Sequence, residues 1–268
     1  MVNGACLISS LCFVVSNVLG IIVIINDISQ ENYDKRSWRS LDSEYLEGRW
    51  EYRSSINLIL QLTHLFNALA WLFFIVPIIQ LAWALSRGGR RRVGIHAAIA
   101  GFGIAACISE VTARLLMLGA SERALRISRS FNLDNWVPTS TNDLLGWKAL
   151  EVSHLVVESM MLWIDAFEWI ALFFIMVFLY FSVGTQVKEN RILPMNWARL
   201  GLLIAFLTFI DFSADVLRLE EWKDFAKFAI FIAVANTLIL LPLWLLVLAC
   251  YMDKVAPRYS ESEDQWNQ

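Results

Sequence analysis

Six long apolar stretches fill most of this chain, and carboxylates interrupt several of them. Roughly 20 apolar residues are enough for a helix to cross a bilayer. The six stretches lie at residues 5–26, 56–86, 94–118, 149–183, 197–218 and 226–252. With 57% hydrophobic residues, 18% charged residues and a mean hydropathy of +0.54, the composition argues against a water-soluble domain. We therefore predict an all-α polytopic membrane protein with six transmembrane helices.

The six spans form a single transmembrane domain that occupies residues 1–252. The first stretch has no basic residues before its apolar core and no clear cleavage site, so we predict that it is retained as a helix. Two outer loops are expected at residues 27–55 and 119–148, and a polar cytoplasmic tail at 253–268. The lipid bilayer is therefore the expected environment of most of the chain.

The basic residues of the short loops predict the orientation of the spans. Arg87, Arg90, Arg91 and Arg92 cluster between the second and third spans, with no acid among them. Lysine and arginine accumulate on the cytoplasmic side of membrane proteins, so this loop is expected inside. Counting the spans from this loop places both termini in the cytoplasm.

Polar residues recur at similar depths in the odd-numbered and in the even-numbered spans. The odd series is Asn17, Glu110 and Asp215, and the even series is Asn67, Asp165 and Asn236, with Glu168 three residues after Asp165. Three repeated two-helix hairpins would produce both series. Internal repeats are a common way of building a membrane site, although the familiar cases use other repeat units.

The fourth span carries the strongest polar pattern in the chain. At about 100° per residue, one arc of about 100° contains Glu151, His154, Glu158, Asp165 and Glu168. Toward the cytoplasm the same face continues as Leu172 and Ile175, so the polar stripe stops partway across the bilayer. This pattern predicts an acidic cavity that is open outward and closed inward. The stretch is longer than a bilayer requires, so an alternative is that its first three polar residues are solvated outside the lipid.

Polar residues of the neighbouring spans extend the predicted cavity. The fifth span has Thr208, Asp211, Asp215 and Arg218 on one side, and the second span has Asn57, Gln61, His64 and Asn67 on a broad arc. In the third span, Glu110 precedes Arg114 by four residues, which is the favourable order for an ion pair within a helix. We expect the cavity to lie between the second, third, fourth and fifth spans.

The surplus of acids over bases suggests what this cavity binds. A carboxylate in hydrocarbon costs roughly 2.5–3.5 kcal/mol, so each acid needs a partner, a proton or water. Two arginines cannot neutralise six acids, which favours a small cation or labile protons. We predict that Asp165 and Asp211 hold the cation and that Glu168 exchanges protons, because burial disfavours a charged carboxyl group. Glu110 and Asp215 would tune the site against the charge partner Arg114. The other predicted cavity-lining residues are His64, Asn67, Glu158 and Asn236.

Two alternatives to transport or channel activity stay open. In the first, the acids only hold helices together, in a non-catalytic assembly or receptor-like protein that binds a protein partner through its outer loops. In the second, His64 or His154 joins Asp165, Asp211 and Asp215 around zinc in a lipid-processing enzyme. No HExxH or CxxC motif is present, so the sequence favours a non-enzymatic protein without a cofactor. No basic tract interleaved with aromatic residues indicates nucleic acid binding.

Tryptophans and prolines add two expectations about the spans. Trp50, Trp147 and Trp197 fall in loops or at helix ends, where an interfacial belt is expected. Pro77 and Pro242 fall inside the second and sixth spans, where each should free a backbone carbonyl and kink its helix.

Overall fold

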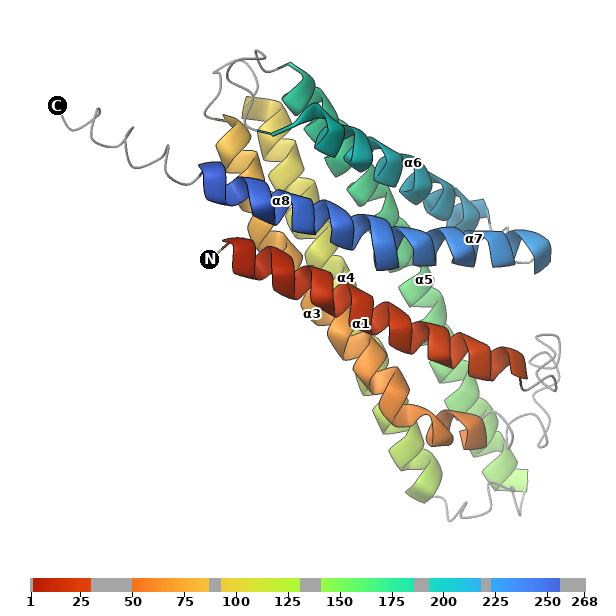
Figure 1. The fold of residues 1–268 in the computed structure, drawn as a ribbon. Coiled ribbons are helices and arrows are strands. Elements are labelled where there is room, and N and C mark those ends of the chain that lie inside the picture. Colours follow the sequence, from red (N-terminus) through yellow and green to blue (C-terminus); the bar gives the residue numbers. More distant parts are fainter. Residues whose placement is uncertain are drawn as a thin grey trace.

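The regular structure of the chain is helical throughout the described part (Figure 1). The computed structural model describes residues 2–29, 50–86, 93–130, 141–185, 193–217 and 223–255. The first five spans are α1 (Val2–Ser29), α3 (Asn57–Ser86), α4 (Val93–Ser130), α5 (Thr141–Gly184) and α6 (Met195–Leu217). The sixth span consists of α7 (Lys223–Ala235), the π-helical turn η5 (Asn236–Leu240) and α8 (Leu241–Val255). Residues 50–55 are also helical and lead into α3.

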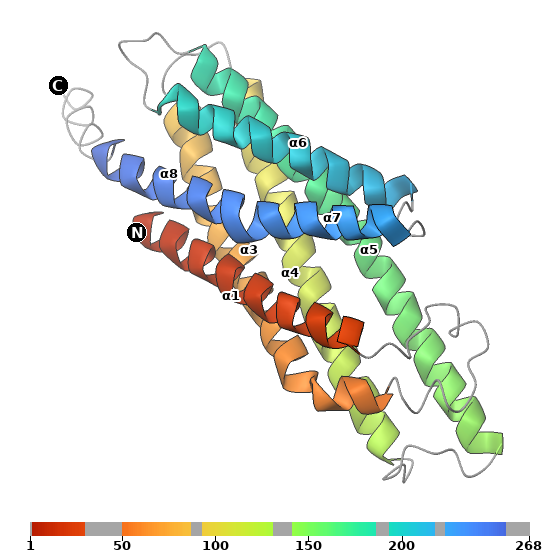
Figure 2. The same cartoon turned by 45° about the vertical axis from the view of Figure 1, so that its right-hand side comes forward.

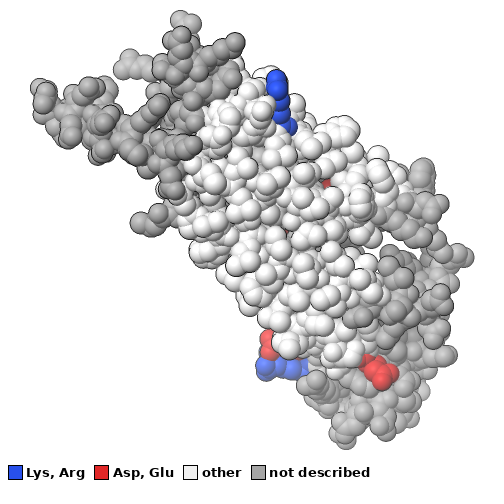
Figure 3. All heavy atoms as spheres, in the orientation of Figure 1, with Lys and Arg blue, Asp and Glu red and all other residues white. Residues whose placement is uncertain are grey.

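Six helical segments are long and apolar enough to cross a membrane, which confirms the prediction of an all-α, six-span protein. Large apolar side chains such as Leu11, Trp163 and Phe231 are exposed along them. In the space-filling view, the charged side chains of the described residues gather near the two ends, and the body between them is almost uncharged (Figure 3). An apolar surface of this extent is suited to contact with lipid.

The six spans pack in chain order and close into a ring (Figures 1 and 2). Helix α3 lies between α1 and α4, and α5 lies between α4 and α6. The sixth span contacts α6 and also packs along α1 through α8 and η5, so the last span returns to the first. The beginning of α1 and the end of α8 therefore lie at the same end of the molecule.

Large side chains fill part of the interior of the ring. Phe13 of α1 packs edge-on against Trp71 and Phe74 of α3, with ring centroids 5.3 and 6.4 Å away. Trp244 of α8 stacks on Trp197 of α6 with a centroid distance of 4.5 Å and also approaches Phe74. All five side chains are buried, so they form the core that joins α1, α3, α6 and α8.

The π-helical turn of the sixth span lies directly before Pro242. Proline has no backbone N–H, and in a regular helix its ring clashes with the carbonyl four residues earlier. In η5 the N–H of Leu241 donates to the carbonyl oxygen of Asn236, five residues earlier, so the helix is locally wider. Pro77, in contrast, lies inside α3, which continues through it.

Helices α4 and α5 are longer than the spans expected for them. Helix α4 continues through residues 119–130, and α5 begins at Thr141, so helix occupies much of the segment expected to be the second outer loop. An i,i+4 ion pair between Glu122 and Arg126 supports the extension of α4. These extensions are helical because their apolar residues find a partner surface of their own.

That surface is a second, smaller hydrophobic cluster at the far ends of α4 and α5. It consists of Trp50, Ala124, Leu125 and Trp147, with Leu144 and Leu150 packed against it. The rings of Trp50 and Trp147 are 6.0 Å apart, and both side chains are buried. The expectation that these two tryptophans lie in an interfacial belt is therefore wrong, because both side chains are buried in this cluster. Trp197 is likewise buried, in the main hydrophobic core.

Several predicted features lie outside the described residues. They are the arginine cluster at 87–92, most of the first outer loop at 30–49, Arg218 and the tail from residue 256 onward.

Candidate functional site

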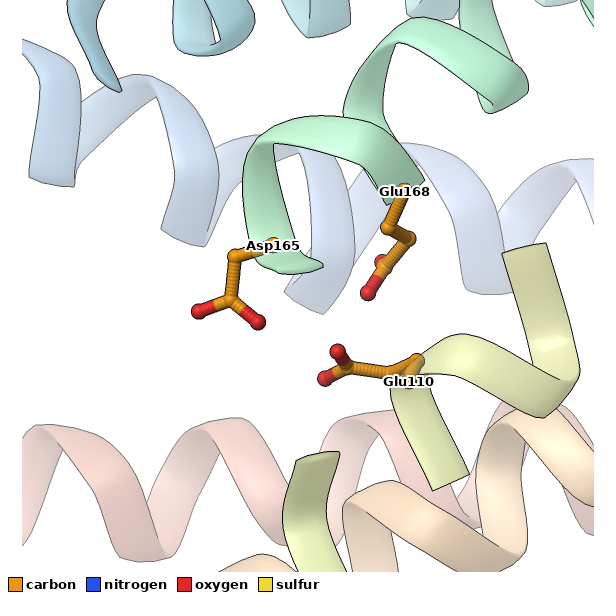
Figure 4. Close-up of side chains that lie close together, drawn as sticks. All are labelled: Glu110, Asp165 and Glu168. Carbon is orange, nitrogen blue, oxygen red and sulfur yellow. The ribbon is translucent and has the colours of Figure 1, made fainter. Parts of the chain in front are cut away.

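Three carboxylates from two neighbouring helices meet inside the ring (Figure 4). Glu110 projects from α4, and Asp165 and Glu168 project from successive turns of α5, with their carboxylates turned toward one another. One carboxylate oxygen of each residue lies within 4.8 Å of those of the other two. Glu110 and Glu168 are 0% and 2% exposed, whereas Asp165 is partly exposed. We call Glu110, Asp165 and Glu168 the acid centre.

Regular helix geometry brings these three residues together. Asp165 and Glu168 are three residues apart, so both lie on the face of α5 that meets α4. On α4, the buried small residues Ala106 and Ala113 flank Glu110 and allow the two helices to approach closely.

The acid centre lies well inside two of the candidate membrane spans. Glu110 is sixteen residues from the start of its candidate span at Gly94, or about 24 Å at 1.5 Å per residue. Glu168 is the same number of residues from the end of its span at Gly184. Both residues are therefore far from the span ends at Gly94 and Gly184.

Arg114 contributes the positive charge next to the acid centre. Its guanidinium pairs with Glu110, one turn earlier on α4, and its Nη2 is 3.3 Å from Oδ1 of Asp165. Glu168 makes no ion pair among the described residues. One guanidinium thus faces three carboxylates in this part of the chain, and ionisation of all three would leave two negative charges without a partner.

The two predicted site residues of α3 differ in their relation to the acid centre. His64 lies close enough to Glu110 and Arg114 to interact electrostatically with both. Asn67 is half-buried, and its side-chain oxygen has no hydrogen-bond partner among the described residues. Of these two residues, His64 is thus the one with an electrostatic interaction with the acid centre.

The remaining predicted site residues are Asp211 and Asp215 on α6 and Asn236 on η5. Asp215 interacts electrostatically with Asp165 and with Asp211. Asp211 is buried, and neither of its carboxylate oxygens finds a hydrogen-bond partner within the described ranges. Asn236 of η5 is buried in the same way, and both polar atoms of its side chain lack such a partner there. Asp215 thus connects Asp211 with the acid centre, whereas no described hydrogen bond or ion pair connects Asn236 with it.

Glu158 belongs to a separate ion-pair cluster, farther out along α5. Nη1 of Arg53 is 3.0 Å from Oε2 of Glu151, and Nη2 of Arg53 is 3.0 Å from Oε1 of Glu158. The same Nη2 lies 3.3 Å from Nδ1 of His154. The guanidinium of Arg53 also lies 4.8 Å from the ring centroid of Trp50, within range of a cation–π interaction. We call Arg53, Glu151, His154 and Glu158 the outer ion-pair cluster.

The outer ion-pair cluster bears on the alternative that the first polar residues of the fourth span are solvated. Glu151 and His154 are 0% and 4% exposed, so neither of them is simply solvated. Sequence reasoning missed Arg53 because it fell in a segment expected to be a loop. Two observations from the sequence could have pointed to Arg53. A buried acidic stripe needs a positively charged partner, and Arg53 is the last arginine or lysine before the second span.

The zinc site considered from the sequence is not assembled by the described residues. His154 belongs to the outer ion-pair cluster, and neither His64 nor His154 forms a group at metal-ligand spacing with the acids of α5 and α6 in this part of the chain. Three carboxylates without a histidine are better suited to a hard cation or to protons than to zinc.

The geometry of the acid centre defines what it can do chemically. Carboxylates this close together can share a proton, because ionising one disfavours ionising the next. They can also provide oxygen ligands to a small cation. Comparison with family models, curated proteins and solved structures finds no match for this chain.

Proposed function

We propose that this six-span membrane protein moves protons or small cations across the bilayer and that the acid centre is its binding site. The observation that carries the proposal is the convergence of Glu110, Asp165 and Glu168 beside a single described guanidinium, at a depth where charge is costly. A bound cation or exchangeable protons would supply the missing positive charge.

A purely structural role explains this arrangement less well. One acid would be enough to pair with Arg114, and an interhelical polar contact stabilises a membrane protein by only about 0.6–2 kcal/mol. Placing Glu168 beside Glu110 adds repulsion whenever both are ionised. The second and third carboxylates therefore favour a ligand-binding role.

The distribution of polar residues along α5 supports access from the outer side. From the acid centre outward, the same face of α5 carries Glu158 and His154. In the opposite direction it carries Leu172, Ile175 and Leu179, all of which are buried. We accordingly propose an acidic cavity that exchanges with the outside and is closed on the inside in this conformation.

Ion flux in proteoliposomes tests the proposal. Flux of H⁺, Na⁺, K⁺ and Ca²⁺ is measured for the wild type, Glu168→Gln and Asp165→Asn. We expect flux of one of these ions in the wild type and a loss of at least roughly tenfold in both variants, because each removes a carboxylate ligand or proton site. Glu122→Gln is the matched control, since Glu122 is an exposed acid that pairs only locally with Arg126. Absence of flux for every ion from folded wild-type protein would contradict the proposal.

A stability measurement on the same variants separates transport from helix packing. Glutamine at position 168 keeps the shape of the side chain and removes one negative charge from the acid centre. We expect Glu168→Gln to unfold at the same or a higher denaturant concentration than the wild type while losing flux. Lower stability with unchanged flux would instead support a structural role for the acids.

Binding of a protein partner outside the membrane is the second candidate function. The observation in its favour is that α4 and α5 extend past the spans expected from the sequence and bury a hydrophobic cluster of their own around Trp50 and Trp147. Leu145 is 59% exposed on this extension, so a photo-crosslinking amino acid placed there would report a partner in native membranes. Folded protein that transports no ion and crosslinks to one partner would favour this second candidate.

A further inference from the structure

A second polar pair lies on the interface of α4 and α5, at the end opposite the outer ion-pair cluster. Nε2 of His96 in α4 and Oγ of Ser182 in α5 are 2.9 Å apart, and both residues are buried. Neither residue belongs to the acid centre. A buried imidazole in an apolar interface is a candidate for a role beyond packing.

The register of the two helices aligns this pair with the acid centre. Fourteen residues separate His96 from Glu110 along α4, and fourteen separate Glu168 from Ser182 along α5. Fourteen residues are about four helical turns, or about 21 Å, so each pair shares one face of its helix. Because the helices are antiparallel and Glu110 meets Glu168, the same register brings His96 to Ser182. We call this line of contacts the α4–α5 seam.

The seam between its two polar ends is apolar. Its buried positions are Ile99 and Cys107 on α4, and Leu172, Ile175 and Leu179 on α5. These side chains belong to the main hydrophobic core. In this conformation these buried apolar side chains lie between the acid centre and His96.

We infer that the transported ion is the proton and that it passes along the α4–α5 seam, with His96 as its acceptor at the inner end. This inference rests on the proposed function of the acid centre. The carboxyl group of Glu168 releases its proton, which moves through water that enters the seam when the apolar positions separate. A ring nitrogen of His96 accepts the proton, forms an imidazolium and then releases it to the inner aqueous phase. Only O–H and N–H bonds break and form, and Glu168 returns to a carboxylate that takes up the next proton from outside.

The chemistry of the inner pair favours the proton over a metal cation. An imidazole accepts a proton on one nitrogen and can release one from the other, and a hydroxyl both donates and accepts hydrogen bonds. Na⁺, K⁺ and Ca²⁺ would require several oxygen ligands, as the acid centre provides. His96 and Ser182 together offer one hydroxyl oxygen, so a metal cation leaving the acid centre would find no comparable second site there.

Two substitutions distinguish a proton relay from a hydrogen bond that only joins the helices. His96→Gln retains a group that can hydrogen-bond to Ser182 but cannot take up a proton near neutral pH. Ser182→Ala removes the hydrogen bond but leaves the imidazole in place. Thr185→Ala, at an exposed hydroxyl near the same end of α5, is the matched control.

Proton flux in proteoliposomes decides between the two roles, with unfolding in detergent measured in parallel. We expect His96→Gln to lower proton flux at least roughly tenfold with little change in stability, because a relay residue is lost. Ser182→Ala should lower flux less than threefold or so, since the imidazole is still present. Flux of Na⁺, K⁺ and Ca²⁺ should stay at background in all variants.

The remaining outcomes overturn this inference and separate its failure from that of the proposed function. Wild-type proton flux in His96→Gln, together with loss of flux in Glu168→Gln, would leave the acid centre as the site and exclude His96 as the relay. Transport of Na⁺, K⁺ or Ca²⁺ through Glu168 would overturn the assignment of the proton alone. Flux that survives Glu168→Gln, or no flux at all in the wild type, would overturn both.

Discussion

Arg53 pairs with two carboxylates near the N-terminal end of α5. Glu151 is fully buried, and Glu158 and the Arg53 guanidinium itself are partly exposed. Removing one partner of a buried ion pair costs more than the pair contributes, because the remaining charge stays desolvated. At this scale the stability of the outer end depends on a single side chain that also packs on Trp50.

Arg53→Gln should therefore lower the free energy of unfolding by about 3 kcal/mol, the lower end for breaking a buried ion pair, since Glu158 keeps some access to water. The measurement is denaturant unfolding in micelles, followed by tryptophan fluorescence. Arg126→Gln, in the exposed pair with Glu122, is the control and should cost less than about 0.5 kcal/mol. Equal losses of unfolding free energy for the two substitutions would show that the outer ion-pair cluster stabilises the protein no more than an exposed ion pair does.

At the scale of the elements, the contact between α3 and α4 depends on one glycine. A Cβ added at Gly103 would overlap with Cγ2 of Ile78, which is fully buried in α3. A Cβ added at Gly101, two residues earlier, would meet no atom within 4 Å. Gly101 and Gly103 therefore have different roles, although they lie only two residues apart in the sequence.

Gly103→Ala should destabilise the protein by about 1–3 kcal/mol, because the interface has no room for an extra methyl group. Gly101→Ala should be neutral or stabilising by up to about 1 kcal/mol, since alanine is the better helix former. Adding Ile78→Ala to Gly103→Ala should leave a smaller loss than the sum of the two single substitutions. Unfolding curves of the four variants in micelles check these expectations, and equal losses at positions 101 and 103 would contradict them.

At the scale of the whole molecule, the ring is closed by contacts between the first and last spans. Oγ1 of Thr237 in η5 donates to Oδ1 of Asn17 in α1 at 2.8 Å, and Oγ of Ser10 donates to the carbonyl oxygen of Pro242. These bonds connect residues more than 200 positions apart in sequence. A ring closed in this way keeps the acid centre surrounded by helices rather than by lipid.

Ring closure predicts a crosslink between Asn17→Cys and Thr237→Cys. In a background without the exposed native Cys250, oxidation should join the two positions within one chain, and peptide mass spectrometry should detect the product. Pairing Thr237→Cys with Leu11→Cys is the control, because Leu11 is 63% exposed on the surface of α1. Equal crosslinking of both pairs would argue against the closed ring.

The orientation of the whole molecule is a further prediction. The arginine cluster at 87–92 predicts that both termini are cytoplasmic. The beginning of α1 and the end of α8 lie on the same side of the molecule, as an even number of spans requires (Figures 1 and 2). A C-terminal tag should therefore resist protease added outside intact cells and be cleaved in inside-out vesicles. The reverse result would place the acid centre in the inner half of the membrane.

The all-α fold class and the polar face of α5 could be predicted from the sequence, because each depends only on residues within one segment. Hydrophobic length predicts a span without knowledge of its neighbours, and a spacing of three and four residues places Asp165 and Glu168 on one face. The i,i+4 spacing likewise places Glu110 next to Arg114. The sequence did not reveal which helix each face contacts, because long helices can pack against one another in many registers.

The sequence by itself determined that this chain spans the membrane six times and carries more acids than it can pair within single helices. Only the tertiary structure decided which acids meet. In the folded protein, Glu110 lies close to Glu168 and Asp165. Arg53 forms ion pairs with Glu151 and Glu158, and His96 lies within hydrogen-bond distance of Ser182. Hydrophobicity and helical periodicity are encoded within a segment, whereas the register between two helices depends on how small and large side chains fit across an interface.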